Sequence, residues 1–451
     1  MFDNILGQNS TQQLSNDIRQ KSLAPSMLFE GPVSSGKAST ALELSRVISC
    51  EQEAEWNCTC SSCSKHLTLI HPDLLCLGSR LFSAEITAAG DTIINDRKNT
   101  ASNILFIRSV RKLLLRFNPV LWEDEPKFSK LSAQVLSLEE DLDEFNIIKD
   151  NKDKALKLIN SIIKDANKLE SIGISSAIPI EQIRRASYWC HLSPFGKSKF
   201  LLIENAESMK EGARNSLLKL LEEPPKSVNI VLTTSRPASL LKTMLSRLRP
   251  YRFILRSEKI EKEVLRRIFC NNFFIPDITL ESSASLNRPG LINAYLDSFV
   301  PVSNNTLKTL AAFFAASAAY KAALIIKNNG KKLPQEIVLL GKLSAPMAEA
   351  SGFLRSEDTK EVTAKIIEAA CGFEVRSMFT LFCNLLLSMI TESFNEFSSH
   401  SPSAALFMEL WLTQINEAES SVMTYNQNIS LALERLLIDL SSKMSELKCS
   451  N

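Results

Sequence analysis

A glycine-containing loop near the start of the chain has the residue types that bind phosphate. Gly31 and Gly36 permit a tight turn, and Lys37 follows directly. The loop lies where a short strand is expected to pass into a helix, so its N–H groups and the lysine would surround the phosphates of ATP. An ordinary strand-to-helix turn is the alternative interpretation. The residues predicted to contact nucleotide are Gly31, Ser34, Ser35, Gly36, Lys37, Ala38, Ser39 and, after a later strand, Thr234.

Two groups that a hydrolytic magnesium site normally uses are missing from the sequence. Ala38 occupies the position that usually supplies a hydroxyl to Mg²⁺, and Ser39 points about 100° away around the helix. After the apolar run at residues 200–203, a hydrolytic site would carry a pair of carboxylates. In this sequence the two positions hold Glu204 and Asn205, so the second carboxylate is replaced by an amide. An amide orients water but cannot take its proton. We therefore expect weak hydrolysis even where Mg²⁺ and ATP bind.

Three other polar positions are candidates for the same chemistry. Glu207 is a substitute carboxylate for Asn205, or else a solvated carboxylate at a helix start. Thr233 and Thr234 end a predicted strand and either bind phosphate or water or cap the strand. Arg247 follows a leucine-rich helix, where an exposed arginine either reaches a neighbouring subunit's nucleotide as an arginine finger or is solvated near a helix end.

Four cysteines, Cys50, Cys58, Cys60 and Cys63, lie within fourteen residues. Four soft thiolates so close together predict a tetrahedral Zn²⁺ site with a structural role. Cys58 and Cys60 are separated by a single residue, which is tighter than usual, so one of them is either replaced as a ligand by His66 or left out of the site. Reduced cysteines in a loop are the other interpretation.

The composition limits the class of protein. The chain has 451 residues, 45% of them hydrophobic and 23% charged, which is enough for two or three packed domains. A net charge of +2 restricts any nucleic-acid contact to a local patch. The N-terminus lacks the pattern of a secretory signal, so we expect a reducing cytoplasmic location. Lys321 interrupts the apolar stretch at residues 309–320 short of the roughly 20 residues that cross a bilayer, so no membrane span is expected.

The elements that would position these residues alternate between strand and helix. Short apolar runs at residues 27–29, 199–203 and 228–233 predict buried strands, and residues 210–221 predict a helix that ends at two prolines. Strand, helix and strand in this order imply a parallel sheet with flanking helices.

Two long segments depart from that alternation. Residues 78–176 predict an inserted, mostly helical arm or, alternatively, a small packed subdomain. From residue 305 onward the pattern is helical, with strongly apolar stretches at residues 310–326, 378–390 and 431–440. An all-helical C-terminal domain is expected.

Taken together, these motifs resemble the bacterial clamp-loader AAA+ subunits of DNA polymerase III, the delta-prime type more than the gamma/tau motor. The resemblance covers about residues 1–77 and 177–300. It depends on Ile5 to Gln8, Leu28 to Pro32, the cysteine cluster, His71 to Asp73, Ile180 to Arg184, the run Asn-Ser-Leu-Leu-Lys-Leu-Leu-Glu-Glu-Pro-Pro at residues 215–225, and Leu245 to Arg247.

The resemblance implies roles for individual residues. Lys37 matches the P-loop lysine, Glu204 and Asn205 match the Walker B pair, Thr234 lies near the sensor position, and Arg247 matches the trans-acting arginine of a Ser-Arg-Cys motif. Further departures from the motor pattern are Ala38, Leu248 in place of that motif's cysteine, and Pro289-Gly290 where the motors carry a nucleotide-sensing arginine.

The resemblance also implies an architecture. We expect an α/β P-loop AAA+ domain at residues 1–254, with the zinc module at 50–66 and the arm at 78–176. A small helical lid at 255–300 and an all-helical collar for oligomerisation at 301–451 would follow.

The expected function is that of a stator-like clamp-loader subunit with a degenerate ATP site. Its partners would be gamma/tau-like and delta-like subunits, the sliding clamp and primed DNA, without a membrane. The first alternative is a motor of the gamma/tau type that hydrolyses ATP itself. The second is a zinc-stabilised adaptor that binds nucleic acid through Arg108, Arg111, Lys112 and Arg116.

Overall fold

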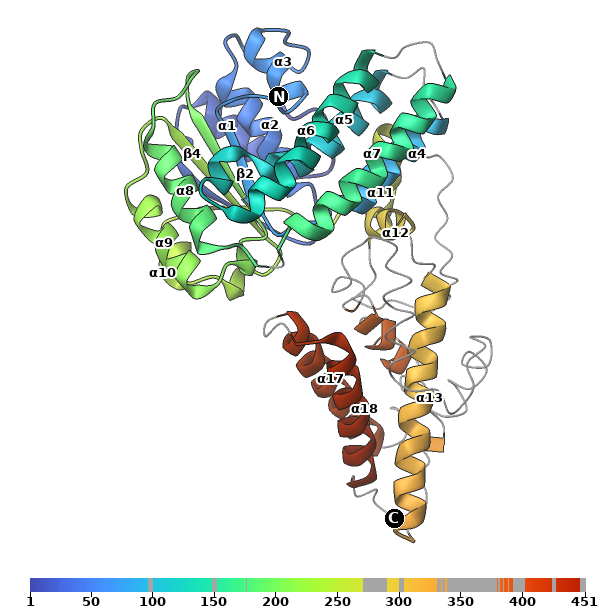
Figure 1. Cartoon of the computed structure of the whole chain (residues 1–451). Coiled ribbons are helices and arrows are strands. Elements are labelled where there is room, and N and C mark those ends of the chain that lie inside the picture. The colour runs from blue at the N-terminus through green and yellow to red at the C-terminus, as the bar shows by residue number, and fades with distance from the viewer. Residues whose placement is uncertain are drawn as a thin grey trace. The chain divides into compact units, whose positions relative to one another are not determined.

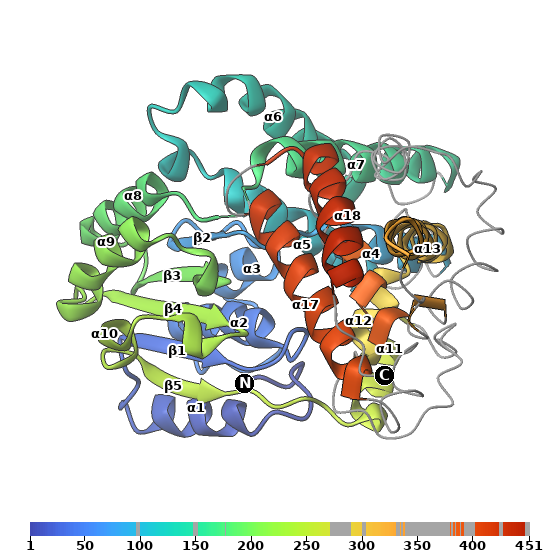
Figure 2. The same ribbon diagram turned by 90° about the horizontal axis from the view of Figure 1, so that it is seen from below.

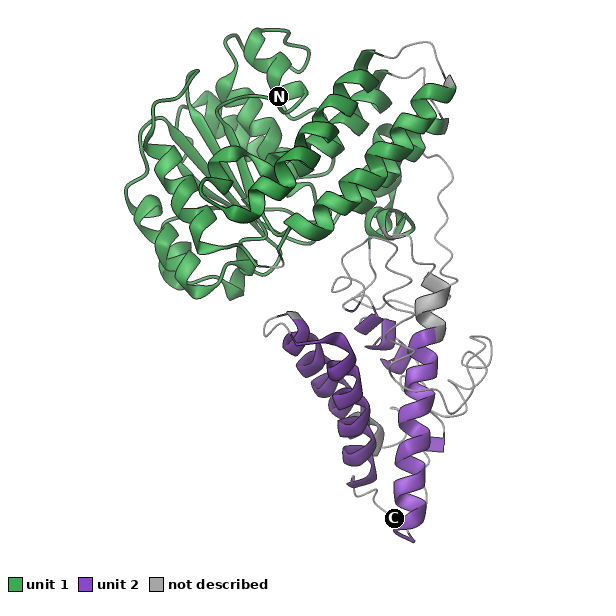
Figure 3. Ribbon diagram, viewed as in Figure 1, with its two compact units in different colours: residues 1–299 green, residues 300–451 purple. Residues whose placement is uncertain are grey.

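The computed structural model describes two compact units, Met1–Phe299 and Val300–Asn451 (Figure 3). The residues that it describes are 1–95, 100–147, 152–175, 177–270, 290–299, 304–330, 402–423 and 427–446, with isolated positions between 334 and 391.

A five-stranded parallel sheet forms the centre of the first unit (Figures 1 and 2). The predicted parallel sheet is therefore confirmed, although the sequence located only its three central strands. The edge strand with Pro250 was missed, because a proline argues against a strand except at an edge, where no ladder hydrogen bond is lost. In spatial order the strands are β2 (Leu74–Gly78), β3 (Lys199–Glu204), β4 (Val228–Thr234), β1 (Ser26–Glu30) and β5 (Arg249–Arg252).

Alternate side chains of each strand pack into different hydrophobic clusters, as the period of two along a strand requires. Phe200 and Leu202 face the cluster built with α1 (Asn9–Arg19) and α2 (Lys37–Ser49). Leu201 and Ile203 face the opposite cluster, which includes α8 (Ile180–His191) and α9 (Glu211–Glu222). Because both faces are covered, the central residues of β1, β3 and β4 form continuous apolar runs.

The segment between β2 and α8 is mostly helical. Its elements are α4 (Ser83–Asn95), α5 (Thr100–Leu114), η1 (Leu115–Phe117), η2 (Pro119–Trp122), α6 (Pro126–Ile147) and α7 (Lys152–Gly173).

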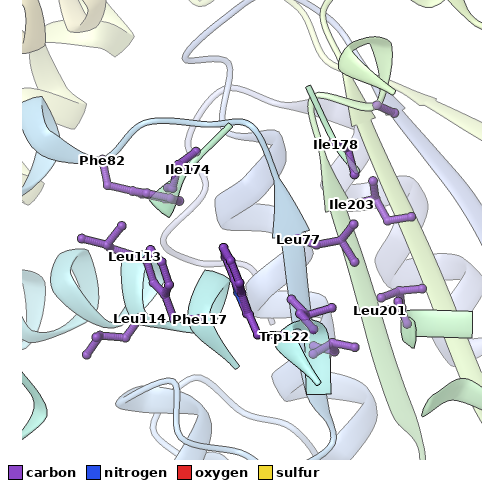
Figure 4. Packing of buried hydrophobic residues seen from close by; sticks show 14 of the residues in the cluster. Leu77, Phe82, Leu113, Leu114, Phe117, Trp122, Ile174, Ile178, Leu201 and Ile203 are labelled. Carbon is purple, nitrogen blue, oxygen red and sulfur yellow. The ribbon is translucent and has the colours of Figure 1, made fainter. Parts of the chain in front are cut away.

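The apolar side chains of this inserted segment join the core of the sheet. Phe117 and Trp122 lie in the same cluster as Leu77, Leu201 and Ile203 (Figure 4). The four helices therefore share the hydrophobic core of the first unit and do not build a separate one.

Two helices follow β5 in the first unit. The helices α11 (Glu258–Ile268) and α12 (Leu291–Asp297) pack on each other and on Ala88 of α4. The carboxylate of Glu261 accepts the N–H of Leu291 at 2.8 Å, which joins the two helices at their ends. They fall in the segment predicted as a lid, of which residues 271–289, including Pro289, lie outside the described part.

The described part of the second unit is helical. The helices α13 (Asn304–Asn328), α17 (Pro402–Met423) and α18 (Ile429–Glu446) contribute Phe314, Trp411 and Leu433 to one core. The helical C-terminal region is thus confirmed. The predicted helix at residues 378–390 lies only partly within the described residues.

The apolar part of α13 is longer than the sequence analysis allowed. The helix continues through Lys321, and its window Leu310–Asn328 has a mean hydropathy of 1.5 over 19 residues. By length and composition this helix is sufficient to cross a membrane, so the argument that Lys321 ends the stretch too early is wrong. It is weak evidence for a span, because 56% of the window is buried and core helices pass the same test.

Gly78 provides a test of this packing at the end of β2. Its φ is +148°, and an added Cβ would lie 2.4 Å from the carbonyl oxygen of Glu204. We expect Gly78→Ala to lower the free energy of unfolding by about 1–3 kcal/mol, because backbone atoms must shift to relieve the overlap. Gly212→Ala, where the nearest atom is a side-chain carbon at 3.3 Å, is the control. Equal stability of the two variants in urea unfolding would contradict this account.

Candidate nucleotide site and metal site

The carboxyl ends of the central strands bring the predicted nucleotide residues to one edge of the sheet. Glu30 at the end of β1 is paired with Thr234 at the end of β4, and Gly78 at the end of β2 is paired with Glu204 at the end of β3. The N–H of Gly31 donates to the carbonyl of Thr234 at 3.2 Å, which fixes the start of the loop against β4. In parallel α/β sheets this edge is where ligands bind.

The two glycines of the loop are required by its geometry. Gly31 has a φ of +148°, and a Cβ there would lie 2.2 Å from the carbonyl oxygen of Phe253. Gly36 has a φ of +97°, and a Cβ there would lie 2.5 Å from a guanidinium nitrogen of Arg256. No other residue type fits either position without displacement of the neighbour.

The side chain of Lys37 folds back onto its own loop. Its Nζ donates to the carbonyls of Gly31 and Pro32, both at 2.6 Å. Burial lowers the pKa of this lysine to about 8. A phosphate in the loop would have to replace these carbonyls as the partner of the ammonium group, as a P-loop lysine can do.

Other side chains hold the remaining loop carbonyls. Arg256 donates to the carbonyl of Ser34 at 2.6 Å, and Gln8 donates to that of Ser35 at 3.0 Å. The hydroxyl of Ser34 also bonds Asn293 of α12. Among the described residues, the N–H groups of residues 33–36 have no hydrogen-bond acceptor, so the loop retains donors for an anion.

Glu204 is engaged by two arginines of the neighbouring segments. Its Oε2 lies 3.4 Å from Nη1 of Arg80 and 3.2 Å from Nη2 of Arg116, and the carboxylate is only 3% exposed. Burial alone would raise the pKa of Glu204, but Arg116 and Arg80 lower it below its ordinary value. The carboxylate is ionised and its charge is neutralised within the chain. The carboxylate that matches the Walker B position is therefore paired with two arginines of the same chain.

The residues after Glu204 have mixed environments. Asn205 has a left-handed backbone with φ of 53°, and its N–H donates to Thr233 Oγ1 at 3.3 Å. Thr234 is buried, and its Oγ1 accepts the N–H of Arg236 at 3.0 Å. The hydroxyls of both threonines therefore accept main-chain N–H groups just after the ends of β3 and β4.

Glu207 is more than a solvated helix-start carboxylate. Its Oε1 accepts the N–H of Ser235 at 3.1 Å and the hydroxyl of the same serine at 2.7 Å. Burial opposes ionisation, but hydrogen bonds from the main chain and from Ser235 lower the pKa of Glu207. In the described structure Oε2 is buried without a hydrogen-bond partner. Glu207 is therefore an ionised carboxylate held at this edge of the sheet.

Arg247 lies apart from this constellation, just after α10 (Lys242–Leu245). Its Nη2 pairs with Glu222 of α9 at 2.7 Å, and its Nη1 donates to the carbonyl of Thr243 at 2.5 Å. One third of the side chain is exposed. Exposed pairs of this kind stabilise a protein by at most about 1 kcal/mol, so the guanidinium can exchange Glu222 for another anion.

The four cysteines converge as a metal site requires. The Sγ atoms of Cys50, Cys58, Cys60 and Cys63 all lie within 4.8 Å of one another. Arg46 donates to the sulfur of Cys63 at 3.2 Å and is itself paired with Glu43 at 2.7 Å. The set of four soft donors with an adjacent cation fits a tetrahedral metal with thiolate ligands.

His66 is not a ligand of this cluster. Its ring stacks on that of His71, with centroids 4.2 Å apart, and its Nδ1 lies 3.3 Å from the hydroxyl of Ser45. Burial lowers the pKa of His66 to about 3, so the ring is neutral. The structure does not support the alternative in which His66 replaces Cys58 or Cys60, because the four sulfur atoms converge without the histidine, which lies on the short helix α3 (Ser61–Leu67).

The basic stretch on α5 does not form a nucleic-acid surface. Arg108 donates to the carbonyls of His66 and Leu67 at 2.9 and 2.7 Å, and Arg111 pairs with Glu139 at 3.3 Å. Lys112 pairs with Glu85, and Arg116 pairs with Glu204. The predicted contact surface is wrong because these four side chains are used to join α5 and η1 to the rest of the unit.

Several residues at the edge of the sheet were missed from sequence. Arg80 comes two residues after β2, so recognition of that strand would have placed it beside the end of β3. Arg256 and Asn293 carried no comparable signal, since they reach the loop from elements more than two hundred residues away.

Comparison with known proteins assigns the chain to a family. A family model described as "DNA polymerase III, delta subunit" matches residues 7–115 and 129–256, more than half of the chain. Subunit delta' of DNA polymerase III from Yersinia pestis is 38% identical over 74 residues, and that from Bacillus subtilis is 49% identical over 49 residues. The Yersinia match covers 16% of this chain and 22% of that relative. The Bacillus match covers 11% of this chain and 15% of that relative.

A solved structure of a DNA polymerase III gamma subunit-related protein from Thermotoga maritima is also similar to this chain. The identity is 20%, the match covers 60% of this chain and 81% of that one, and the TM-score is 0.28.

The parallel sheet with flanking helices and the family match agree with the DNA polymerase III subunit that the sequence motifs predicted. The chain belongs to the DNA polymerase III delta subunit family.

The cysteine cluster can be tested by metal analysis. We expect the purified chain to hold about one zinc ion, and Cys63→Ser to lose most of it together with thermal stability, because metal binding contributes to folding. Cys190→Ala, which changes a buried cysteine outside the cluster, is the matched control and should keep its zinc. Retention of a full equivalent by Cys63→Ser would show that the ion lies elsewhere.

Proposed function

We propose that this chain is a stator-like subunit of the DNA polymerase III clamp loader, which helps to load the sliding clamp onto primed DNA without efficient ATP hydrolysis of its own. The observation that carries the proposal is the double ion pair of Glu204 with Arg80 and Arg116. These ion pairs occupy the carboxylate that would bind the metal. The same site already lacks a hydroxyl at Ala38 and a general base at Asn205.

The loop keeps the capacity to bind nucleotide weakly. Its glycines, its free N–H groups and Lys37 supply the phosphate contacts. The lysine must first leave the carbonyls of Gly31 and Pro32, and the loop stays held by Arg256 and Gln8. We infer that ATP with Mg²⁺ is at most a structural ligand here, with Zn²⁺ in the cysteine module as the structural metal.

The residue that would take part in ATP hydrolysis is Arg247, as an arginine finger in the site of a gamma/tau-like neighbour. Its surface position and its exchangeable pair with Glu222 support this role. A positive charge near the transferred phosphate lowers the barrier of that reaction. Sister subunits, the delta-like chain among them, would pack against the helical collar in the cytoplasm.

Exposed apolar side chains on the described helices of the second unit support a collar that packs with sister subunits. Leu412 on α17 and Leu431 and Ile438 on α18 are 42%, 55% and 62% exposed. In a free chain these side chains face water, whereas a subunit interface would bury them.

A single-chain ATPase assay separates this proposal from the motor alternative. We expect turnover at least about a hundredfold below that of a working ATPase, because a missing general base alone removes a factor of 10²–10⁴. Lys37→Ala should abolish the remaining binding of a fluorescent ATP analogue and serves as the control. Brisk hydrolysis by the wild-type chain would favour a motor, with Glu207 as the base.

Substitution of Arg247 tests the finger. In the assembled complex, Arg247→Ala should lower DNA-dependent ATPase activity by at least about tenfold, since arginine fingers contribute 10³–10⁵ in rate. Glu222→Gln removes the same ion pair but keeps the arginine, so it should leave the ATPase rate unchanged. Gel filtration should show intact assembly for both variants. An equal effect of the two variants would assign Arg247 a structural role only.

A further inference from the structure

The glycine-containing loop before α2 includes a serine with a left-handed backbone. Ser34 has a φ of 55°, and Gly36, two residues later, has a φ of 97°. Among the described residues of the loop, Val33 and Ser35 are not in this region. Alternation of this kind turns successive N–H groups toward one point and forms a concavity that binds anions. The conformation of Ser34 therefore helps to decide whether the free N–H groups of the loop converge.

Two side chains hold Ser34 in this conformation. A residue with a Cβ is unfavourable in the left-handed region and persists there only where its surroundings fix it. Nη1 of Arg256 donates to the carbonyl of Ser34 at 2.6 Å. The hydroxyl of Ser34 donates to Oδ1 of Asn293. Arg256 thus holds the main chain of this residue, and Asn293 holds its side chain.

Asn293 is itself fixed relative to Arg256. It lies in α12, and the N–H of Leu291, the first residue of that helix, donates to Oε2 of Glu261 in α11 at 2.8 Å. The glycine at position 290 allows this approach, because a Cβ there would lie 2.5 Å from Oε1 of the same carboxylate. A closed ring of contacts therefore joins the loop to Arg256, α11 and α12.

We infer that Asn293 is a positioning residue, which holds Ser34 in the left-handed conformation that directs the N–H groups of the loop toward a phosphate. A concavity that is already formed binds more tightly, because less of the loop has to be ordered when the ligand arrives. Asn293 acts through Ser34 and needs no contact with the phosphate. The inference rests on the proposed binding of nucleotide in the loop and is independent of the stator role.

The test is the affinity of the full chain for a fluorescent ATP analogue with Mg²⁺. Asn293→Ala should weaken binding about fivefold, which is the scale of one hydrogen bond. Ser298→Ala is the matched control, because the hydroxyl of Ser298 donates to the carbonyl of Tyr295 at 2.6 Å, at the other end of the same helix. It should leave the affinity unchanged.

Two substitutions of Ser34 separate backbone positioning from a direct contact of its hydroxyl with phosphate. Ser34→Ala and Ser34→Gly both lose the bond to Asn293, but only glycine adopts a positive φ without strain. We therefore expect Ser34→Gly to bind the analogue about fivefold more tightly than Ser34→Ala. Asn293→Ala should add no further loss to Ser34→Ala, since both substitutions remove the same bond.

Three results would overturn the inference. They are equal affinity of the Asn293→Ala and Ser298→Ala variants, equal affinity of the Ser34→Ala and Ser34→Gly variants, and the lack of saturable binding by the wild-type chain. The assay measures binding and not turnover. Brisk hydrolysis of ATP would therefore contradict the stator role and leave the comparison of these variants unaffected.

Discussion

The ion pairs of Glu204 with Arg80 and Arg116 are the interaction on which the first unit depends. They join the end of β3 to the residues after β2 and to η1, across 124 residues of sequence in the case of Arg80. Removal of one partner from a buried pair of this kind costs about 3–5 kcal/mol, because the other charge is left unpaired. The same interaction that holds the inserted helices to the sheet therefore also occupies the carboxylate that a magnesium ion would need.

Charge neutralisation continues outward from this pair. Arg80 also contacts Glu85 at 2.7 Å, and Glu85 contacts Lys112 of α5. Each charge in this buried chain has an opposite partner, which is the condition under which ions are tolerated in a protein interior. The inserted helices are thus attached by charge at the carboxyl edge and by apolar packing against Leu77 and Ile203 below it.

The cysteine module is attached to the same framework by a different route. Cys50 follows α2, the helix that begins at Lys37, and Lys197 of the loop before β3 donates to the carbonyl of Cys50. Arg46 on α2 contacts Glu43 and Cys63. A metal held by the four thiolates would therefore stiffen the helix that carries Lys37 and the loop before β3 together.

The elements that the sequence analysis located were those with a strong local signal. The runs at β1, β3 and β4 are continuous apolar segments between polar flanks, and the helix α9 ends where two prolines forbid its continuation. The strand β2 has the same kind of apolar run but lies between the cysteine module and the inserted helices. A short apolar run in that position is equally compatible with a strand and with part of a buried helix. Without β2, the position of Arg80 beside Glu204 could not be deduced.

What the sequence determined by itself is the chemistry available at fixed positions: the two glycines and the lysine of the loop, the absence of a hydroxyl at Ala38 and of a base at Asn205, and the four cysteines. Only the tertiary structure decided the partners of the charged and aromatic side chains. It placed two arginines on Glu204, stacked His66 on His71, and used the basic residues of α5 inside the unit. The physical reason is that local patterns report on conformation and burial, whereas an ion pair depends on which distant segments the fold brings within about 4 Å.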